Sequence, residues 1–592
     1  MNFSNKTTNV IAAILLGIMF VMTVFSIKDD TFTFDETAHV ASGYSYLTQR
    51  DFRLNPEHPP LIKDLAALPL LFLNLNFPKD HPSWIQKEPP QWWFQFDFAN
   101  QFLYYSDNNP DKILFWSRLP MILVLVFLGW FLFYWTKKLF DNKAALLALF
   151  LFTFSPTFLA HGRLVTTDVG AALGVVLATY FWLKFLENPT KKNVILAGLI
   201  FGLVMLIKFS LILLIPFFGL ITLIYAWLFA SKKPILNILK YLALALLIGT
   251  IGMIFIIWPV YQHHISDYPE ERQIRDTQFL LSTTAIHEPL INLNNWLAAN
   301  PILRPFSQYL LGLLLAINRS MTGHTTFFLG DISAKAWKSY FPIVYLIKEP
   351  LTFHILTLIA LLYAAWLIRK PFWQNTLMRI KSWIKSHFPE FTMLAFLGIY
   401  WLTSLTAELN IGVRHLLPVF PFTFILVSSL IIFWLKPPLL KLKYLFLGIL
   451  LIWQLFSVTS IYPHFLAYFN ELAGGPNQGY IYTVDSNLDW GQDLKRLKKW
   501  LDEKNIDKIY LDYFGGGDAR YYLKEKFAPW WGKRDPEEFP KGSYLAISAT
   551  HLQGGRAQPV KGFAEPADYY RWLDKYEPIT KIGYSIFVYQ IK

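Results

Sequence analysis

The sequence predicts a mainly α-helical, multi-pass membrane protein that ends in a small α/β domain. Hydrophobic residues make up 54% of the 592-residue chain and aromatic residues 18%, far more than is usual in a soluble protein. Apolar runs of roughly 20 residues, the length needed to cross a bilayer, recur along the chain. Short lysine clusters separate many of these runs. Together these observations favour repeated membrane crossings over one soluble core.

About eleven apolar runs qualify as membrane crossings. The first run follows a short polar start, and no small-x-small cleavage site ends it, so we expect a retained helix and not a signal peptide. The predicted crossings are residues 10–27, 114–135, 144–161, 169–187, 194–207, 210–230, 239–260, 351–368, 391–406, 415–435 and 443–462.

Positive charges occur in every second connecting loop. The positive-inside rule therefore places these loops and the N-terminus in the cytoplasm. The long loops 28–112 and 262–350 and the tail from 463 then lie on the extracytoplasmic side of the cell membrane. The cytoplasmic clusters are Lys137, Lys138 and Lys143; Lys191 and Lys192; Lys232, Lys233 and Lys240; the run from Arg369 to Lys385; and Lys436, Lys441 and Lys443.

The composition changes near residue 463. Residues 1–462 form the predicted membrane domain, and its two long loops, rich in aromatic residues and proline, are expected to cover the membrane surface. In residues 463–592 the charges are mixed and the apolar stretches KIYLDYF, SYLAISA and YSIFVYQ are short. The stretch GQDLKRLKKWLDEKNI has helical spacing of its apolar residues. Residues 463–592 are therefore predicted to form an extracytoplasmic α/β domain.

Composition also excludes several kinds of function. The chain has no cysteine, so disulfides, thiolate nucleophiles and cysteine-ligated metals are excluded. Its formal charge is +13, but Lys and Arg are dispersed between apolar runs and not gathered on one soluble face. We therefore expect membrane lipids, and no nucleic acid, as partners.

Two adjacent acids follow the first crossing in the stretch TFTFDET. Thr33 and Glu36 have the spacing of a helix capping box, and acids in a first turn favour the helix dipole. The capping box by itself explains why a glutamate stands at position 36, without any catalytic role for Glu36. It also places Asp35 at a helix start on the outer face, held anionic by backbone N–H groups, where a general base could stand. The residues alone leave the capping role and the catalytic role open.

Other polar residues collect on the same face. Pro59 and Pro60 fix the backbone beside Glu57 and His58, which suits either a rigid helix start or an anion site. In the short turn HGRLVTTD, Asp168 either caps the following helix or serves a site.

Several cations stand on this face although the positive-inside rule disfavours them there. Lys208 lies in the run GLVMLIKFSLILLIP, where the chain turns back at the outer face. We therefore expect this lysine to have an anionic partner. The same reasoning covers Arg414 and His415 in AELNIGVRHLLP. Further cations of the outer face are Arg163, Arg319, His324 and Lys348.

An acid near a ring of cations at headgroup depth suits a reaction whose leaving group is a lipid-linked phosphate. Once cations hold the phosphate no general acid is needed, and one carboxylate that accepts a proton suffices. A glycosidase would need two opposed carboxyls and water. The alternative is a transporter or flippase of a lipid-linked or anionic substrate, whose ionisable residues should lie near the middle of the bilayer.

Short motifs in a fixed order resemble a known enzyme group, the lipid-carrier-dependent glycosyltransferases of the GT-C fold. The similarity is greatest to the protein O-mannosyltransferase-like glycosyltransferase family 39, to which the aminoarabinose transferases of lipid A are related. Ala38, His39 and His58 depart from the aminoarabinose transferase pattern. The motifs are FDE at 34–36, EHPPL at 57–61, GRLVTTD at 162–168, LIKFSLILLIP at 206–216, GVRHLLPVFPF at 412–422 and DSNLDWGQDLKRLKKWL in the tail.

This resemblance implies transfer of a sugar, a hexose or a pentose, from a polyprenyl-phosphate monosaccharide to an acceptor hydroxyl on the extracytoplasmic side, with inversion. By position, Asp35, Glu36 and Asp168 match the acidic positions of the family, and Lys208 and Arg414 match cations that hold the lipid phosphate. The acceptor, a protein, a lipid or a glycan, is left open. Arg163, His58 and Lys348 complete the predicted phosphate-binding set, and Glu57, His415 and His324 are further candidate site residues.

The resemblance also raises the question of a metal. Oligosaccharyltransferases of the same broad fold bind a divalent ion between two acids, as Asp35 and Asp168 could. Their Trp-Trp-Asp motif is absent, because QWWF lacks the acid and lies in another loop. A reaction without metal or other cofactor is therefore favoured.

Overall fold

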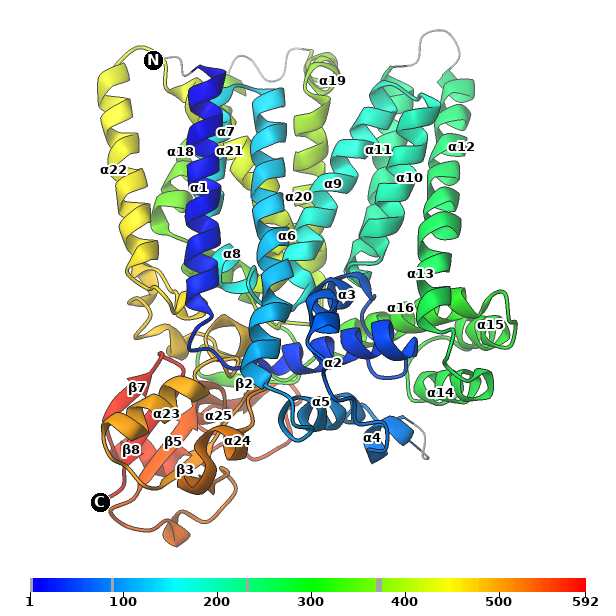
Figure 1. Cartoon of the computed structure of the whole chain (residues 1–592). Helices are drawn as coiled ribbons and strands as arrows, with labels where there is room; N and C mark the ends of the chain where they lie inside the picture. The colour runs from blue at the N-terminus through cyan, green and yellow to red at the C-terminus, as the bar shows by residue number, and fades with distance from the viewer. Residues whose placement is uncertain (1–3, 87–89, 230–233, 369–374) are drawn as a thin grey trace.

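The computed structural model describes residues 4–86, 90–229, 234–368 and 375–592. Long helices stand side by side in a bundle, with the N-terminus at one end and the C-terminal strands at the other (Figure 1). Of the charges used to predict the orientation, Lys232, Lys233 and the segment 369–374 lie outside the described residues.

Within the described ranges, 9 helical segments are long and apolar enough to cross a membrane. The two other predicted crossings, 144–161 and 194–207, coincide with the shorter helices Asn142–Thr153 (α7) and Lys191–Met205 (α10). The prediction of a multi-pass, mainly helical protein is therefore confirmed. The long segments are Asn5–Ser26 (α1), Pro110–Leu139 (α6), Thr167–Glu187 (α9), Phe209–Leu228 (η2, Phe209–Leu213, and α11, Leu214–Leu228), Pro234–His264 (α12, Pro234–Gly252, to α13, Trp258–His264), Leu351–Ile368 (α18), Phe388–Thr406 (α20), Val413–Trp434 (η4, Val413–Val419, and α21, Phe420–Trp434) and Leu440–Thr459 (α22).

Local sequence signals set the ends of these helices. Asn109 caps α6, and Pro110 occupies its first turn, where a missing N–H costs nothing. Lys137 and Lys138 in the last turn of α6 favour its dipole. Asp141 then caps α7, so α6 and α7 are joined by a very short turn and pack as neighbours.

Short helices cover one end of the bundle, which we call the loop face. In Figure 1, α2, α5, α14, α15 and α16 lie across this end, in agreement with loops that cover a membrane surface. The helices of the first long loop are Phe34–Gln49 (α2), Leu61–Ala67 (α3), Pro82–Ile85 (α4) and Phe94–Tyr104 (α5). Those of the second are Glu270–Ser282 (α14), Glu288–Ala298 (α15), Arg304–Thr322 (α16) and Tyr340–Lys348 (α17). The remaining short membrane-domain helices are Pro156–His161 (α8) and Thr376–Ser386 (α19).

The C-terminal residues form a five-stranded sheet with the strand order β4-β3-β5-β8-β7. Strand β3 pairs in parallel with β4 and β5, and β8 is antiparallel to β5 and β7. The three stretches predicted as strands are β3, β5 and β8, and the predicted helix is α23. The elements are Leu494–Glu503 (α23), Ile509–Asp512 (β3), Ala519–Leu523 (α24), Phe527–Pro529 (β4), Tyr544–Ser548 (β5), Ala549–Gly554 (α25), Thr580–Ile582 (β7) and Ile586–Gln590 (β8).

A second, three-stranded sheet joins the second long loop to the C-terminal segment. Thr326–Phe328 (β1) pairs antiparallel with Asp331–Ser333 (β2), and β2 pairs in parallel with Gln558–Val560 (β6). Strands this short give no alternation signal, so the sequence did not predict them. The start of α2 is also tied to the C-terminal segment, because Phe34 N donates to the carbonyl oxygen of Trp490 at 3.1 Å.

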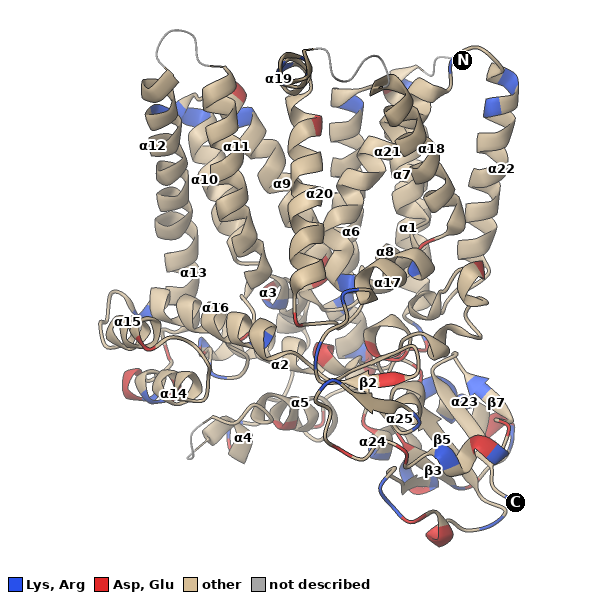
Figure 2. Cartoon of the chain, turned by 180° about the vertical axis from the view of Figure 1, so that it is seen from behind, with Lys and Arg blue, Asp and Glu red and all other residues tan. Residues whose placement is uncertain are grey.

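Charge is distributed as expected of a membrane-spanning bundle. Figure 2 shows little Lys, Arg, Asp or Glu along the middle of the long helices and more at their two ends. A charged side chain in the bilayer centre is costly, so the uncharged middle marks the zone that the membrane would occupy. Which end of the bundle faces the cytoplasm stays a prediction.

Candidate functional site

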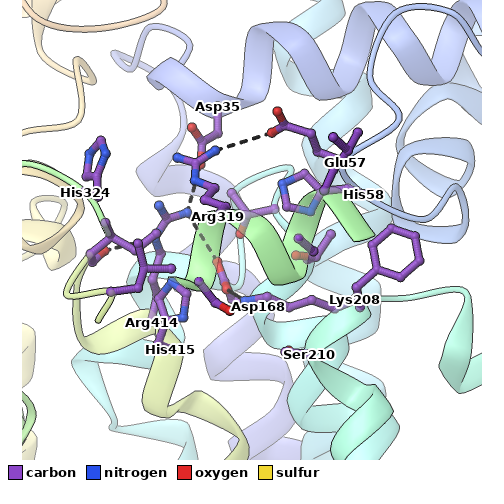
Figure 3. Close-up of a pocket in the computed structure, with 18 of the residues that line it drawn as sticks. Asp35, Glu57, His58, Asp168, Lys208, Ser210, Arg319, His324, Arg414 and His415 are labelled. Carbon is purple, nitrogen blue, oxygen red and sulfur yellow. Dashed lines mark hydrogen bonds and ion pairs between the residues drawn. The ribbon is translucent and has the colours of Figure 1, made fainter. Parts of the chain in front are cut away.

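A cavity of about 530 Å³ opens at the loop face, where the ends of spanning helices meet α2, α16 and the C-terminal segment (Figure 3). It is lined by side chains from stretches that lie hundreds of residues apart in the sequence. The predicted site residues that line it are Asp35, Glu57, His58, Asp168, Lys208, His324, Arg414 and His415.

Asp35 stands in the first turn of α2 with its side chain 30% exposed. Arg414 Nη1 donates to Asp35 Oδ2 at 2.9 Å. Burial by itself raises the pKa of Asp35, but the charges of Arg414 and His39 outweigh burial and hold the pKa below its usual value. Asp35 is therefore an anion at neutral pH, which a general base must be.

Asp168 lies between two cations at the start of α9. Lys208 Nζ is 2.6 Å from Asp168 Oδ1, and Arg414 Nη1 is 3.7 Å from Asp168 Oδ2. The carboxylate is 2% exposed, whereas Lys208 and Arg414 keep part of their surface in the cavity. One buried carboxylate thus holds two cations side by side, and both cations present N–H donors that suit an anionic ligand.

A further ion pair lines the cavity between Arg319 of α16 and Glu57, 3.3 Å apart. Burial raises the pKa of Glu57 and lowers that of His324 to about 4. Burial also holds the pKa of His58 well below its usual value. Both histidines are therefore neutral at pH 7, so His58 can offer a phosphate a hydrogen bond but no charge.

One wall of the cavity is aromatic. Phe34 contacts Phe514 and Phe96, with ring centroids 5.4 and 4.8 Å apart, and Phe96 in turn contacts Trp92 at 4.8 Å. Trp93 continues the row at 4.9 Å from Trp92. The row runs from the C-terminal segment to α5 and borders the face of α2 that carries the acid.

The C-terminal segment also positions the central arginine. The guanidinium of Arg414 lies over the ring of Trp490, 4.2 Å from its centroid. Trp490 is 1% exposed, so this ring is a fixed platform. Stacking on an aromatic face leaves the edge N–H groups of a guanidinium free to bind anions.

Glu36, predicted beside Asp35 as a catalytic acid, does not line the cavity. Successive helix residues point about 100° apart, so the two carboxylates face different surroundings. Glu36 is fully buried and accepts hydrogen bonds from Arg118 at 2.6 and 2.9 Å, from Val165 N at 2.8 Å and from Thr33 N at 2.9 Å. These contacts favour a structural role for Glu36. The hydrogen bond from Thr33 N is the one that the side chain of Glu36 contributes to the predicted capping box.

Two predicted phosphate ligands also lie outside the cavity. Arg163 Nη1 donates to Asp30 Oδ2 at 2.5 Å and to the Ser26 carbonyl at 2.9 Å. The ammonium of Lys348 is buried and donates to three backbone carbonyls at 2.6–2.9 Å. Both cations therefore have partners within the protein and do not face the cavity. The carbonyls that accept from Lys348 belong to Leu466, Tyr468 and Asn487.

Some cavity residues were not singled out as site residues by the sequence. Asp485 and Trp490 come from DSNLDW in the tail, where the density of polar residues beside a tryptophan was the available signal. His39, Ser210 and Tyr400 gave no such signal, because each lies in an ordinary helical or apolar context.

The residues present do not fit the divalent ion considered between Asp35 and Asp168. Arg414 Nη1 stands between the two carboxylates, 2.9 and 3.7 Å from them. In the part of the chain that the structure describes, no group of three or more His, Cys, Asp or Glu side chains is arranged to hold a metal ion. A reaction without metal stays a prediction.

Comparison with known proteins supports the resemblance seen in the motifs. Residues 112–258 match a family described as dolichyl-phosphate-mannose-protein mannosyltransferase. No curated protein matches the chain significantly.

Several solved structures have a similar arrangement. The archaeal oligosaccharyltransferase AglB from Archaeoglobus fulgidus, in complex with an inhibitory peptide and a dolichol-phosphate, is 11% identical over 92% of this chain and 71% of that chain, with a TM-score of 0.44. The apo form of the Archaeoglobus fulgidus oligosaccharyltransferase is 11% identical over 90% and 65%, with a TM-score of 0.47. ArnT from Cupriavidus metallidurans bound to undecaprenyl phosphate is 11% identical over 98% and 97%, with a TM-score of 0.27. No residue role or substrate follows from likenesses this distant.

The long apolar helices indicate the class of a multi-pass membrane protein. Within it, residues 112–258 are similar to dolichyl-phosphate-mannose-protein mannosyltransferases, in agreement with the motifs of that stretch.

Proposed function

We propose that this protein transfers one monosaccharide, a hexose or a pentose, from a polyprenyl-phosphate donor to an acceptor hydroxyl on the extracytoplasmic face of the cell membrane. One observation carries this proposal: the anionic Asp35 shares a single cavity with Lys208 and Arg414 at the ends of spanning helices. A base and a phosphate-binding pair are the two requirements of such a transfer.

The donor phosphate binds between Lys208 and Arg414. Asp168 holds both cations and is therefore a positioning residue. The polyprenyl chain lies toward the bilayer, where Ile212 and Leu213 line the same cavity. These two side chains belong to η2, which is part of a candidate membrane span.

The reaction is a single displacement at the anomeric carbon. The acceptor oxygen forms the new bond from the side opposite the phosphate, its proton passes to Asp35, and the bond between the anomeric carbon and the phosphate oxygen breaks. The electron pair of that bond leaves with polyprenyl phosphate, whose added negative charge is stabilised by Lys208 and Arg414. One displacement inverts the anomeric configuration.

Phosphate binding also prepares the base. Arg414 donates a hydrogen bond to Asp35. A phosphate that engages Arg414 weakens this interaction, which raises the proton affinity of Asp35 when the donor is in place.

The position of the cavity favours an enzyme over a transporter. A transporter binds its substrate near the middle of the bilayer, between helices that alternate in access. Here the ionisable residues of the cavity lie at one end of the bundle, and the middle of the long helices carries little charge (Figure 2). This position suits chemistry at the membrane surface.

The proposal is tested with purified protein in lipid vesicles. We expect the wild type to release polyprenyl phosphate from one of a set of polyprenyl-phosphate hexoses and pentoses when acceptor material from cells lacking the protein is supplied. Mass spectrometry of the glycoconjugates, with and without the protein, identifies the sugar and the acceptor. Failure to turn over any donor, or equal turnover by Asp35→Asn, contradicts the proposal.

A further inference from the structure

A third carboxylate enters the cavity from the C-terminal segment. Asp485 lines the cavity together with Asp35 and Arg414, and it is half-buried. The charges that act on it include those of Arg414, Asp35 and Arg319. Asp485 therefore faces the centre of the proposed site, although it is placed there by a different part of the chain.

The backbone at Asp485 has an unusual conformation. Its φ is 55°, in the left-handed region that residues other than glycine seldom adopt. Asp485 N donates to Thr550 Oγ1 at 3.1 Å, which fixes the turn to α25. Such a conformation persists only where the surroundings over-determine it, and it is most common at functional sites.

The same turn is locked to the segment that carries Arg414. Ser486 Oγ donates to the carbonyl of Ile411 at 2.6 Å, and Val413 N donates to Asn487 Oδ1 at 2.9 Å. Gly412, between them, has a φ of 116° and leaves no room for a side chain beside Ser486. The distance between Asp485 and Arg414 is thus fixed by several bonds across two segments.

The carboxylate of Asp485 has capacity for a ligand. One oxygen, Oδ1, accepts from Ser486 N at 2.5 Å. Within the described ranges no Lys or Arg forms an ion pair with Asp485, whereas Asp35, Asp168 and Glu57 each form at least one. Burial and the nearby Asp35 raise the pKa of Asp485 to about 6, against the lowering effect of Arg414. At neutral pH it is mainly a hydrogen-bond acceptor without a strong partner.

The geometry of the cations decides which part of a substrate meets Asp485. Lys208 pairs with Asp168 at one side of the cavity, and Arg414 lies on the other side of Asp168, where it also contacts Asp35, as Figure 3 shows. A phosphate between Lys208 and Arg414 leaves the space bounded by Arg414, Asp35 and Asp485 for the group that the phosphate carries.

We propose that Asp485 accepts hydrogen bonds from hydroxyl groups of the transferred sugar and thereby determines which sugar the protein accepts. This role rests on the proposed function. A carboxylate accepts from two neighbouring hydroxyls at once, so its placement discriminates between sugars that differ in one hydroxyl. The C-terminal segment thus supplies sugar specificity, and the membrane helices supply the phosphate site.

The test compares two ligands that differ only in the sugar. Binding of polyprenyl phosphate, and of the polyprenyl-phosphate hexose or pentose that the wild type binds most tightly, is measured for the wild type, Asp485→Asn and Asp485→Gly. Asparagine and glycine both tolerate the left-handed backbone, so both variants should keep the fold. We expect Asp485→Gly to weaken binding of the sugar-bearing lipid about tenfold or more and to leave polyprenyl phosphate binding unchanged.

The outcomes separate this inference from the proposed function. An equal loss for both lipids, no loss for either, or a wild type that binds no sugar-bearing lipid better than polyprenyl phosphate overturns the role of Asp485. Lys208→Met is the matched control: it should weaken binding of both lipids. If Lys208→Met binds both lipids as the wild type does, the phosphate site itself, and with it the proposed function, is wrong.

Discussion

The guanidinium of Arg414 donates a hydrogen bond to the carboxylate of Asp35 at 2.9 Å, across 379 positions of the sequence. The same nitrogen lies 3.7 Å from Asp168, which also binds Lys208. The proposed base, Asp35, and the two cations proposed to bind the phosphate therefore form one connected charge network. Any ligand that engages Arg414 also changes the proton affinity of Asp35.

Replacing Asp35, the proposed base, should stop sugar transfer but leave the binding of polyprenyl phosphate intact. Asp35→Asn keeps the shape of the side chain but cannot take a proton, so we expect the rate of sugar transfer to fall by about a hundredfold or more while polyprenyl phosphate still binds. Transfer and lipid binding are measured on the same preparation. Asp267→Asn, which removes an exposed carboxylate paired with Arg50, is the matched control and should keep full activity. Sugar transfer at the wild-type rate by Asp35→Asn would show that Asp35 is not the base.

Removing one phosphate cation should weaken donor binding. Lys208→Met keeps the apolar stem and removes the charge, so we expect polyprenyl phosphate to bind about tenfold more weakly or worse. Lys495→Met removes a lysine that pairs with Asp111 outside the cavity, and it should leave binding unchanged. Equal affinities of the two variants for the lipid would exclude Lys208 from the phosphate site.

The buried carboxylate next to the base should matter for stability. Glu36 pairs with Arg118 with no exposure of either side chain. Breaking one side of a buried ion pair typically costs about 3–5 kcal/mol. We therefore expect Glu36→Gln to lower the thermal unfolding temperature clearly, while the folded fraction binds polyprenyl phosphate normally. A variant with normal stability and no transfer would instead place Glu36 in the chemistry.

One buried acid outside the spans should make stability depend on pH. Burial raises the pKa of Glu349 from 4.5 to about 7, and Ser155 Oγ donates to its two oxygens at 2.9 and 3.1 Å. The folded protein therefore binds more protons than the unfolded chain between these two pKa values, so this contribution to stability is lost as pH rises through the window. Glu349→Gln should unfold at a temperature that changes less between pH 5 and pH 8 than that of the wild type, as thermal melts would show. An identical pH dependence of both proteins would contradict the raised pKa.

Close contact between the loop after β3 and the segment that precedes α2 should be needed for activity. Gly516 N donates to the Phe32 carbonyl at 3.2 Å, and a side chain there would overlap the carbonyl oxygen of Thr33. Gly516→Ala should therefore push the C-terminal segment away from Asp35 and reduce transfer. Gly554→Ala, where an added Cβ meets only Ile332 at 3.9 Å, is the control in the same segment. Equal transfer rates in both variants would show that this contact is dispensable.

The local elements could be predicted because their signals are local. Spanning helices follow from length and hydropathy, and the start of α2 follows from Thr33 and Glu36 three positions apart. The strands β3, β5 and β8 are apolar stretches between polar ones, and the structure has them where they were expected. Strands of three residues, such as β1 and β6, carry too little pattern and were missed.

The candidate site was only partly predictable. Lys208 and Arg414 were singled out as cations on the face that is predicted to be extracytoplasmic, and both line the cavity. Arg163 and Lys348 satisfied the same rule, yet their charges are used by Asp30 and by backbone carbonyls. Asp485 could not be assigned, because nothing in its neighbourhood of the sequence reveals that its turn meets the segment before η4.

By itself, the sequence determined a bundle of spanning helices, a polar face and a small terminal sheet, because hydropathy, helix length and capping act over a few residues. Only the tertiary structure decided which polar side chains meet. Asp35 and Glu36 are neighbours in the chain, and the packing of α2 turns one toward the cavity and the other toward Arg118. Contacts between distant parts of the chain determine which way each face of a helix points, so this direction cannot be read from the local sequence pattern.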